Sequence, residues 1–89
     1  MDLYKQEVFR QYNRAKVAAR RGQLDPKRLN RALGLLLSRR FYSKIREYGT
    51  TYNSCGCPDA ANRNHFCKHR LAVIMAQRAT QYVQSELSK

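Results

Sequence analysis

The stretch CGCPDAANRNHFCKHR, residues 55–70, contains all three cysteines and both histidines of the chain. Cys55 and Cys57 form one close pair, and Cys67 and His69 form a second pair beyond a gap of nine residues. A structural zinc ion needs four sulfur or nitrogen ligands at tetrahedral corners, and two such pairs supply them. We therefore predict a structural Zn²⁺ ion held by Cys55, Cys57, Cys67 and His69, with Gly56 letting the backbone bend between the first two ligands.

Other interpretations of these residues are weaker. Three cysteines cannot all pair within one chain, and a single residue separates two of them, so a disulfide framework is not expected. Cysteines and histidines scattered through a core would rarely form two close pairs in a chain that has no other cysteine. His65 is an alternative ligand to His69, although its polar surroundings favour a loop position.

The same ligand set argues against catalysis. A zinc ion with four protein ligands has no open position for water or substrate. The six carboxylates are spread along the chain without an obvious pair, and none of the four glycines belongs to a phosphate-binding loop. We therefore expect neither an enzyme nor a small-molecule substrate.

Helical spacing of apolar residues dominates the sequence outside this stretch. Residues 2–21 lack Pro and Gly, and Gly22 is placed to end a helix there. Asp25 and Pro26 are typical of the start of a second helix. A third helix is expected after Cys67, and its broad apolar face predicts that it is the most buried. The apolar positions expected on the first two helices are Tyr4, Val8, Tyr12, Ala15 and Ala19, then Leu29, Ala32, Leu33, Leu36 and Leu37.

Between Phe41 and Cys55 the pattern indicates strands. Phe41, Ser43 and Ile45 alternate with polar residues and Tyr42, Gly49 marks a turn, and the residues that follow are good strand formers. We predict a β-hairpin here, with Tyr42 on the same strand face as Lys44 and Arg46.

One domain is expected over residues 1–89, because the chain is too short for two sizeable cores. The predicted fold class is α+β: two N-terminal helices in residues 1–40, a zinc-bound hairpin and helix in residues 41–78, and the end of that helix in residues 79–89.

The order Cys-x-Cys-Pro-Asp, a short polar loop, then Cys-Lys-His and an aliphatic helix resembles a SWIM-type zinc finger. The resemblance covers roughly residues 41–78. It implies a ββα zinc module with ligands at Cys55, Cys57, Cys67 and His69. It also implies DNA-binding or protein-binding roles, since such fingers occur in transposases, chromatin-remodelling ATPases and recombination-related proteins. Only about forty residues precede the finger in this sequence, so we expect no catalytic domain to accompany it.

The composition points to an acidic partner. Eighteen Lys and Arg residues against six Asp and Glu give a formal net charge of +12 on 89 residues. Arginine, which binds phosphate oxygens through two parallel hydrogen bonds, outnumbers lysine by twelve to six. The predicted phosphate-binding surface comprises Arg10, Arg14, Arg21, Arg28, Arg31, Arg39, Arg40, Lys44 and Arg46. A merely solvated surface is the alternative.

The sequence thus favours a zinc-dependent, non-catalytic accessory protein that binds nucleic acid, with DNA preferred to RNA on the resemblance alone. The alternative is an adaptor subunit that docks on a larger nucleic-acid-processing complex such as a polymerase, nuclease or recombinase. The N-terminal residues lack the apolar segment of a secretory signal, and no apolar run is long enough to span a bilayer. We expect a cytoplasmic, nucleoid-associated or nuclear protein with no membrane partner.

Overall fold

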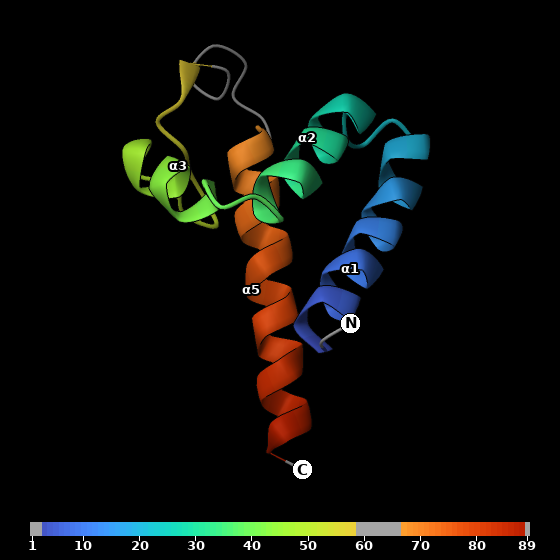
Figure 1. Ribbon diagram of the computed structural model, residues 1–89. Coiled ribbons are helices and arrows are strands. Elements are labelled where there is room, and N and C mark those ends of the chain that lie inside the picture. The colour runs from blue at the N-terminus through green and yellow to red at the C-terminus, as the bar shows by residue number, and fades with distance from the viewer. Residues whose placement is uncertain (1–2, 59–66, 89) are drawn as a thin grey trace.

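The computed structural model describes residues 3–58 and 67–88, and within these residues it contains four helices (Figure 1). They are α1 (Leu3–Arg20), α2 (Pro26–Leu36), α3 (Phe41–Glu47) and α5 (Lys68–Leu87). None of the described helices is both long and apolar enough to cross a membrane.

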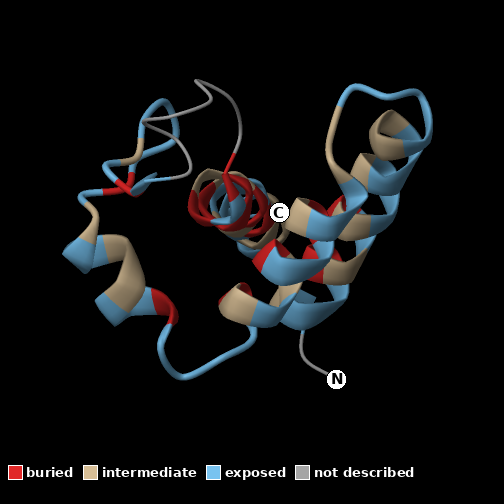
Figure 2. Ribbon diagram, turned by 90° about the horizontal axis from the view of Figure 1, so that it is seen from above, coloured by how far each residue is buried: buried red, intermediate tan, exposed pale blue. Residues whose placement is uncertain are grey.

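Helix α5 is the centre of the fold. It runs through the middle of the molecule, with α1 and α2 on one side and α3 on the other (Figure 1). Viewed along α5, the buried residues of the surrounding helices lie on the sides that face it (Figure 2). The expected central role of the last helix is confirmed, because α5 contributes more buried residues than any other described helix. The buried core comprises Val8, Leu29, Ala32, Leu36, Phe41, Leu71, Ala72, Val73, Met75 and Ala79.

The turn between α1 and α2 confirms that Gly22 ends the first helix and that Asp25 and Pro26 begin the second. Gly22 has a positive φ of 78°, and its amide donates to the carbonyl of Ala19 while the amide of Gln23 donates to the carbonyl of Ala18. This hydrogen-bond pair is the Schellman arrangement that ends helices at glycine. The Asp25 carboxylate accepts from the Lys27 amide at 2.9 Å, and Pro26 occupies the first position of α2.

The backbone hydrogen bond from Lys27 is also the main reason that the pKa of Asp25 lies below its ordinary value of 3.8. The stabilising contribution of this cap is therefore present above the ordinary pKa and is lost as the pH falls through the lowered one.

The predicted hairpin is wrong, because residues 41–47 form helix α3. Phe41 is buried and Ile45 is half-buried, whereas Ser43, which a strand would place on the same face, is exposed. Phe41, Ile45 and Tyr48 are spaced by four and three residues, so they also fit a helical stripe. The spacing of Phe41 and Ile45, at i and i+4, fits the period of a strand and that of a helix. Packing against α5 favours the helix.

The second half of the expected hairpin is also absent. Gly49, with a φ of 56°, ends α3 by the same hydrogen-bond pattern as Gly22, since the Thr50 amide donates to the Ile45 carbonyl at 2.9 Å. Thr51 then closes a tight turn, in which its hydroxyl accepts from the amides of Asn53 and Ser54. Residues 3–58 and 67–88 contain no strand, so the α+β class and the ββα module implied by the resemblance are both corrected to an all-helical arrangement.

Helix α1 contains a buried polar contact that its sequence pattern did not predict. Glu7 and Gln11 are both buried, and the Gln11 amide donates to the Glu7 carboxylate at 2.8 Å. Arg10 lies 3.3 Å from the second oxygen of Glu7 and places its guanidinium over the ring of Tyr82, 5.5 Å from the ring centre. Arg10 therefore joins α1 to α5 as well as carrying charge.

Candidate metal centre

The four predicted ligands lie together. The ligand atoms of Cys55, Cys57, Cys67 and His69 all fall within 4.8 Å of one another. A tetrahedral zinc with Zn–S bonds of about 2.3 Å separates its sulfurs by roughly 3.8 Å, so a small contraction would bring the group to zinc geometry. Cys57, Cys67 and His69 are buried and Cys55 is half-buried. The chain therefore contains a Cys₃His group that is suited to hold a metal ion, as its sequence predicts. Asp59 and the alternative ligand His65 lie outside the described residues.

The second ligand pair stands at the start of α5, as expected. Cys67 is the N-cap residue of α5, and its sulfur accepts from the Arg70 amide at 3.5 Å. Nδ1 of His69 lies 3.9 Å from the Cys67 sulfur, and the His69 ring packs against Tyr48 with the ring centres 4.8 Å apart. Tyr48, immediately after α3, thereby fixes the orientation of the imidazole, a contact that the ligand spacing alone did not reveal.

The first ligand pair is held by the segment that follows α3. The Thr50 side chain is buried, and its hydroxyl lies 3.1 Å from the Cys55 sulfur. Arg70 donates to the carbonyl of Tyr52, and Arg78 donates to the Tyr52 hydroxyl at 3.3 Å. Two arginines of α5 thus attach this segment to the helix that bears the other ligands.

The electrostatics of the thiols favour a cation at this place. Burial raises the pKa of the Cys55 thiol, but hydrogen bonds from Thr50 and from the Cys57 amide outweigh burial and lower the pKa overall. Burial, opposed by the Arg70 amide and reinforced by Cys57 and Cys55, raises the pKa of Cys67 to about 11. Three thiolates this close repel one another, so a divalent cation would supply the missing positive charge and release the thiol protons on binding.

Gly56 has a steric role that differs from the predicted bend. Its amide donates to the Tyr48 carbonyl at 2.9 Å, and a Cβ added at Gly56 would lie only 2.9 Å from the same oxygen. We expect Gly56→Ala to lower the stability of the metal-loaded protein by about 1–3 kcal/mol, the usual cost of overpacking, and to weaken zinc binding. Thermal melting and zinc competition against a chromophoric chelator measure the two effects.

Gly34→Ala is the matched control for that variant. Gly34 lies inside α2 with nothing within 4 Å of an added Cβ. Alanine there should raise stability by roughly 0.5–1 kcal/mol, because glycine is the poorer helix former. Destabilisation of the same size in both variants would contradict the steric role of Gly56.

The nine predicted phosphate-binding residues are distributed over several elements. Arg14, Arg21, Arg31, Arg39, Arg40 and Arg46 are exposed. Lys44 lies 3.2 Å from Glu47, and Arg28 lies 2.7 Å from Asp25 with 13% of its side chain exposed. Tyr42, which was predicted to share a strand face with Lys44 and Arg46, is 75% exposed, and its ring lies 5.2 Å from that of Phe41 between ring centres.

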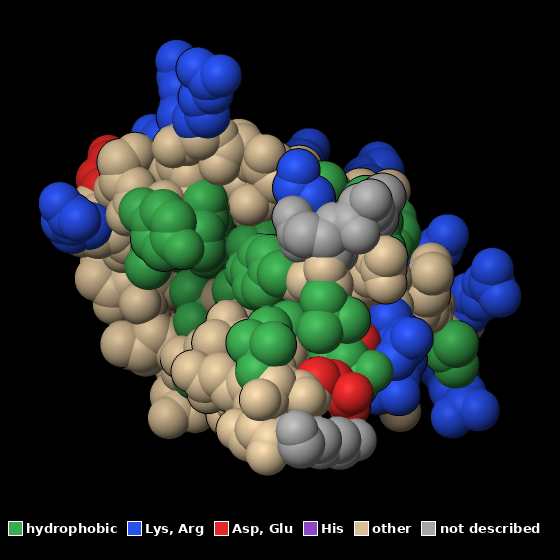
Figure 3. Space-filling model, turned by 60° about the horizontal axis from the view of Figure 1, so that its bottom comes forward, with side chains coloured by type: hydrophobic (Ala, Val, Ile, Leu, Met, Phe, Trp, Pro, Cys, Tyr) green, Lys and Arg blue, Asp and Glu red, His purple; other side chains and the backbone are tan. Residues whose placement is uncertain are grey.

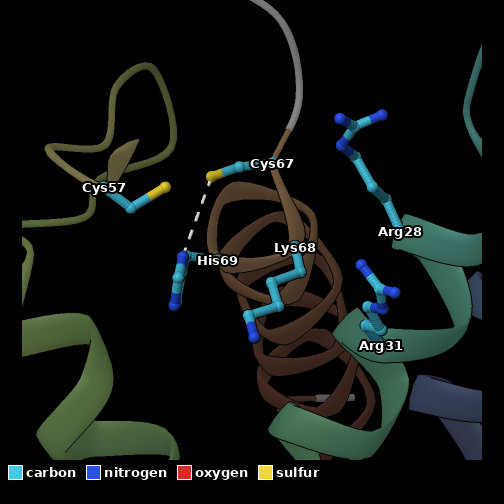
Figure 4. A pocket seen from close by; sticks show the side chains of 6 residues that line it. All are labelled: Arg28, Arg31, Cys57, Cys67, Lys68 and His69. Carbon is cyan, nitrogen blue, oxygen red and sulfur yellow. Dashed lines mark hydrogen bonds between the residues drawn. The ribbon is translucent and has the colours of Figure 1, made fainter. Parts of the chain in front are cut away.

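A cavity of about 250 Å³ adjoins the metal centre. It is bounded by three of the predicted ligands together with Arg28, Arg31 and Lys68 (Figure 4). Lys68 was absent from the predicted surface. Its position between two ligands in sequence is a signal that could have identified it.

Comparison of the chain with protein-family models, with curated proteins and with solved structures finds no match.

Proposed function

We propose that this protein is a non-catalytic, zinc-dependent accessory protein that binds nucleic acid through backbone phosphates. The observation that carries the proposal is the conjunction of a formal charge of +12 with a Cys₃His group whose adjoining cavity is lined by cations. With four protein ligands, a zinc ion there would serve the fold and leave no position for a substrate. DNA is preferred to RNA only because the ligand order resembles a SWIM-type finger.

Zinc fits this group better than magnesium or calcium. Three thiolates and one imidazole are a donor set typical of structural zinc sites, whereas magnesium and calcium select oxygen ligands. The ion would tie the segment after α3 to the first turn of α5. The proposed role of the metal is therefore to fix the position of α3 relative to α5, and with it the exposed arginines on α3 and just before it.

The test is a titration of zinc-loaded protein against labelled duplex DNA, single-stranded DNA and RNA at several salt concentrations. We expect log K to fall linearly with log salt, with a slope of about −0.9 per phosphate contacted on a duplex. Replacing Arg39 and Arg40 by Gln should reduce the slope by roughly two.

Replacement of Arg20 and Lys27 by Gln is the matched control, because it removes the same charge from exposed positions outside the predicted surface. A smaller change in slope is expected for this pair. If both double variants reduce the slope equally, the predicted residues do not form a defined phosphate-binding surface. Absence of nucleic-acid binding at low salt would overturn the proposal.

An apolar groove of about 340 Å³ favours the adaptor function as a second candidate. It lies where α3 and α5 meet the start of α1, and its apolar wall includes Phe41, Ile45 and Val73. From below, hydrophobic side chains gather on one face of the molecule, with Lys and Arg side chains at its edges (Figure 3). Since Arg46 on α3 and Arg39 just before it are exposed, the complementary occupant is an amphipathic partner helix with acidic flanks.

A model peptide with leucines on one face and glutamates on the other tests the groove. We expect it to shift the NMR signals of Ile45 and Val73 and to bind less tightly to Ile45→Glu. A peptide of the same composition in scrambled order is the control. Equal binding of both peptides would overturn the adaptor function.

A further inference from the structure

The cavity beside the metal centre has the composition of an anion site. Arg28 and Arg31 lie on α2, and Lys68 lies between them and the ligands at the start of α5 (Figure 4). Among the residues that the structure describes, three cations and no carboxylate line this cavity. Because α2 and α5 pack against each other, the backbone positions of the three cations are fixed before any ligand arrives.

The size of the cavity restricts what it accepts. Sites for drug-sized molecules span roughly 300–1,000 Å³, and this cavity encloses about 250 Å³. One small anionic group fits this volume. Guanidinium forks and an ammonium group are the donors that proteins use for phosphate oxygens.

Among the described residues, the cavity keeps an excess of positive charge after the nearby anions are counted. Arg28 is paired with Asp25 at 2.7 Å, and this contact also holds its guanidinium in place. A zinc ion with three thiolates carries a formal charge of −1. Three cations, less one charge for Asp25 and one for the metal centre, leave one positive charge, which matches the single negative charge of a phosphodiester.

We propose that Arg28, Arg31 and Lys68 form a phosphate-binding site that takes one backbone phosphate of the bound nucleic acid. This inference rests on the proposed function. It goes further by assigning a specific contact and by adding Lys68 to the phosphate-binding residues. Lys68 is flanked by Cys67 and His69, so a metal that fixes these ligands also fixes Lys68, and metal loading is coupled to phosphate binding.

Two single variants test the site. Lys68→Gln and Arg31→Gln in the zinc-loaded protein should each lower the affinity for a DNA duplex of about 20 base pairs about tenfold at low salt. Each should also reduce the slope of log K against log salt by about one. Lys27→Gln is the control, because it removes an exposed charge from α2 without lining the cavity. We expect its affinity to fall less than twofold. Fluorescence anisotropy gives these affinities, and zinc content is measured on each sample.

The outcomes separate this inference from the proposed function. If the wild type binds the duplex and the two cavity variants behave like Lys27→Gln, the phosphate site is overturned and the proposed function stands. If the cavity variants lose zinc in proportion to their loss of affinity, the cations serve the metal centre, and the site is likewise overturned.

Inorganic phosphate distinguishes the source of the phosphate group. In the wild type it should shift the NMR signals of Arg31 and Lys68 at millimolar concentration, and Lys68→Gln should abolish the response. If it does so while no nucleic acid binds, the cavity takes phosphate from another source, the assignment to a nucleic-acid backbone is overturned and the proposed function fails. If phosphate causes equal shifts in the wild type and in Lys68→Gln, the site is overturned.

Discussion

Cys57→Ser should abolish stoichiometric zinc binding and lower stability by several kcal/mol, well above the roughly 1 kcal/mol of an ordinary substitution. Cys57 is 2% exposed, and its sulfur lies within 4.8 Å of the other three ligand atoms. Serine keeps the size of the side chain but does not supply a thiolate, so three ligands would remain for the metal. When a metal ion orders the chain that binds it, its binding free energy contributes to the free energy of folding. A loss of zinc affinity therefore also lowers the stability of the protein.

The loss should be local as well as large. The metal would join the segment 48–57 to the start of α5, whereas α1 and α2 pack on α5 without contributing a ligand. Hydrogen exchange should therefore increase first in α3 and in the segment after it, with α1 and α2 retaining more protection. Zinc content by mass spectrometry and exchange rates measure the two effects.

His65→Ala is the control for the ligand assignment. We expect it to retain one zinc per chain, whereas His69→Ala should behave like Cys57→Ser. Zinc loss in His65→Ala with full retention in His69→Ala would reverse the assignment of the fourth ligand. Unchanged zinc content and melting in Cys57→Ser would remove the metal centre altogether.

Leu29→Ala should destabilise the protein by about 2–5 kcal/mol, the range for truncation of a buried leucine. Leu29 is 1% exposed and belongs to the core where α2 packs on α5. The truncation removes apolar burial and leaves a cavity that rigid helices close only in part. Small domains are stable by roughly 5–15 kcal/mol, so this single change would remove a large share of the total.

Leu37→Ala is the matched control, since Leu37 lies at the end of the same helix and is 45% exposed. We expect a loss well below that of Leu29→Ala, measured by urea unfolding of zinc-loaded protein. Leu29→Ala should still bind one zinc at low temperature, because the ligands lie outside α2. Loss of zinc in the folded Leu29→Ala variant would show that the core and the metal centre are not separable.

The ligand set, the end of α1 and the start of α2 could be predicted because they depend on neighbours in sequence. Gly22 and Asp25 act on amides within a few residues, and hydrogen bonds of this kind are formed wherever the residue types recur. Cys55 and Cys57 are adjacent in space because one residue separates them. These features required no knowledge of how the helices pack.

Helix α3 could not be predicted from the sequence. Phe41 and Ile45 lie four residues apart, a spacing that fits both the two-residue period of a strand and the 3.6-residue period of a helix. The decision came from contacts distant in sequence: Phe41 joins the core around α5, and Tyr48 packs on His69. A strand would have needed a second strand to satisfy its backbone groups, and the described residues provide none.

By itself the sequence determined which residues can hold a metal, where the first helix ends and the second begins, and that the chain is strongly basic. Only the tertiary structure decided that Lys68 shares a cavity with Arg28 and Arg31, residues that lie about forty positions earlier in the chain. The physical reason is the range of the interactions. Capping and ligand pairing act over a few residues, whereas the position of one helix against another is set by the sum of many contacts across the core.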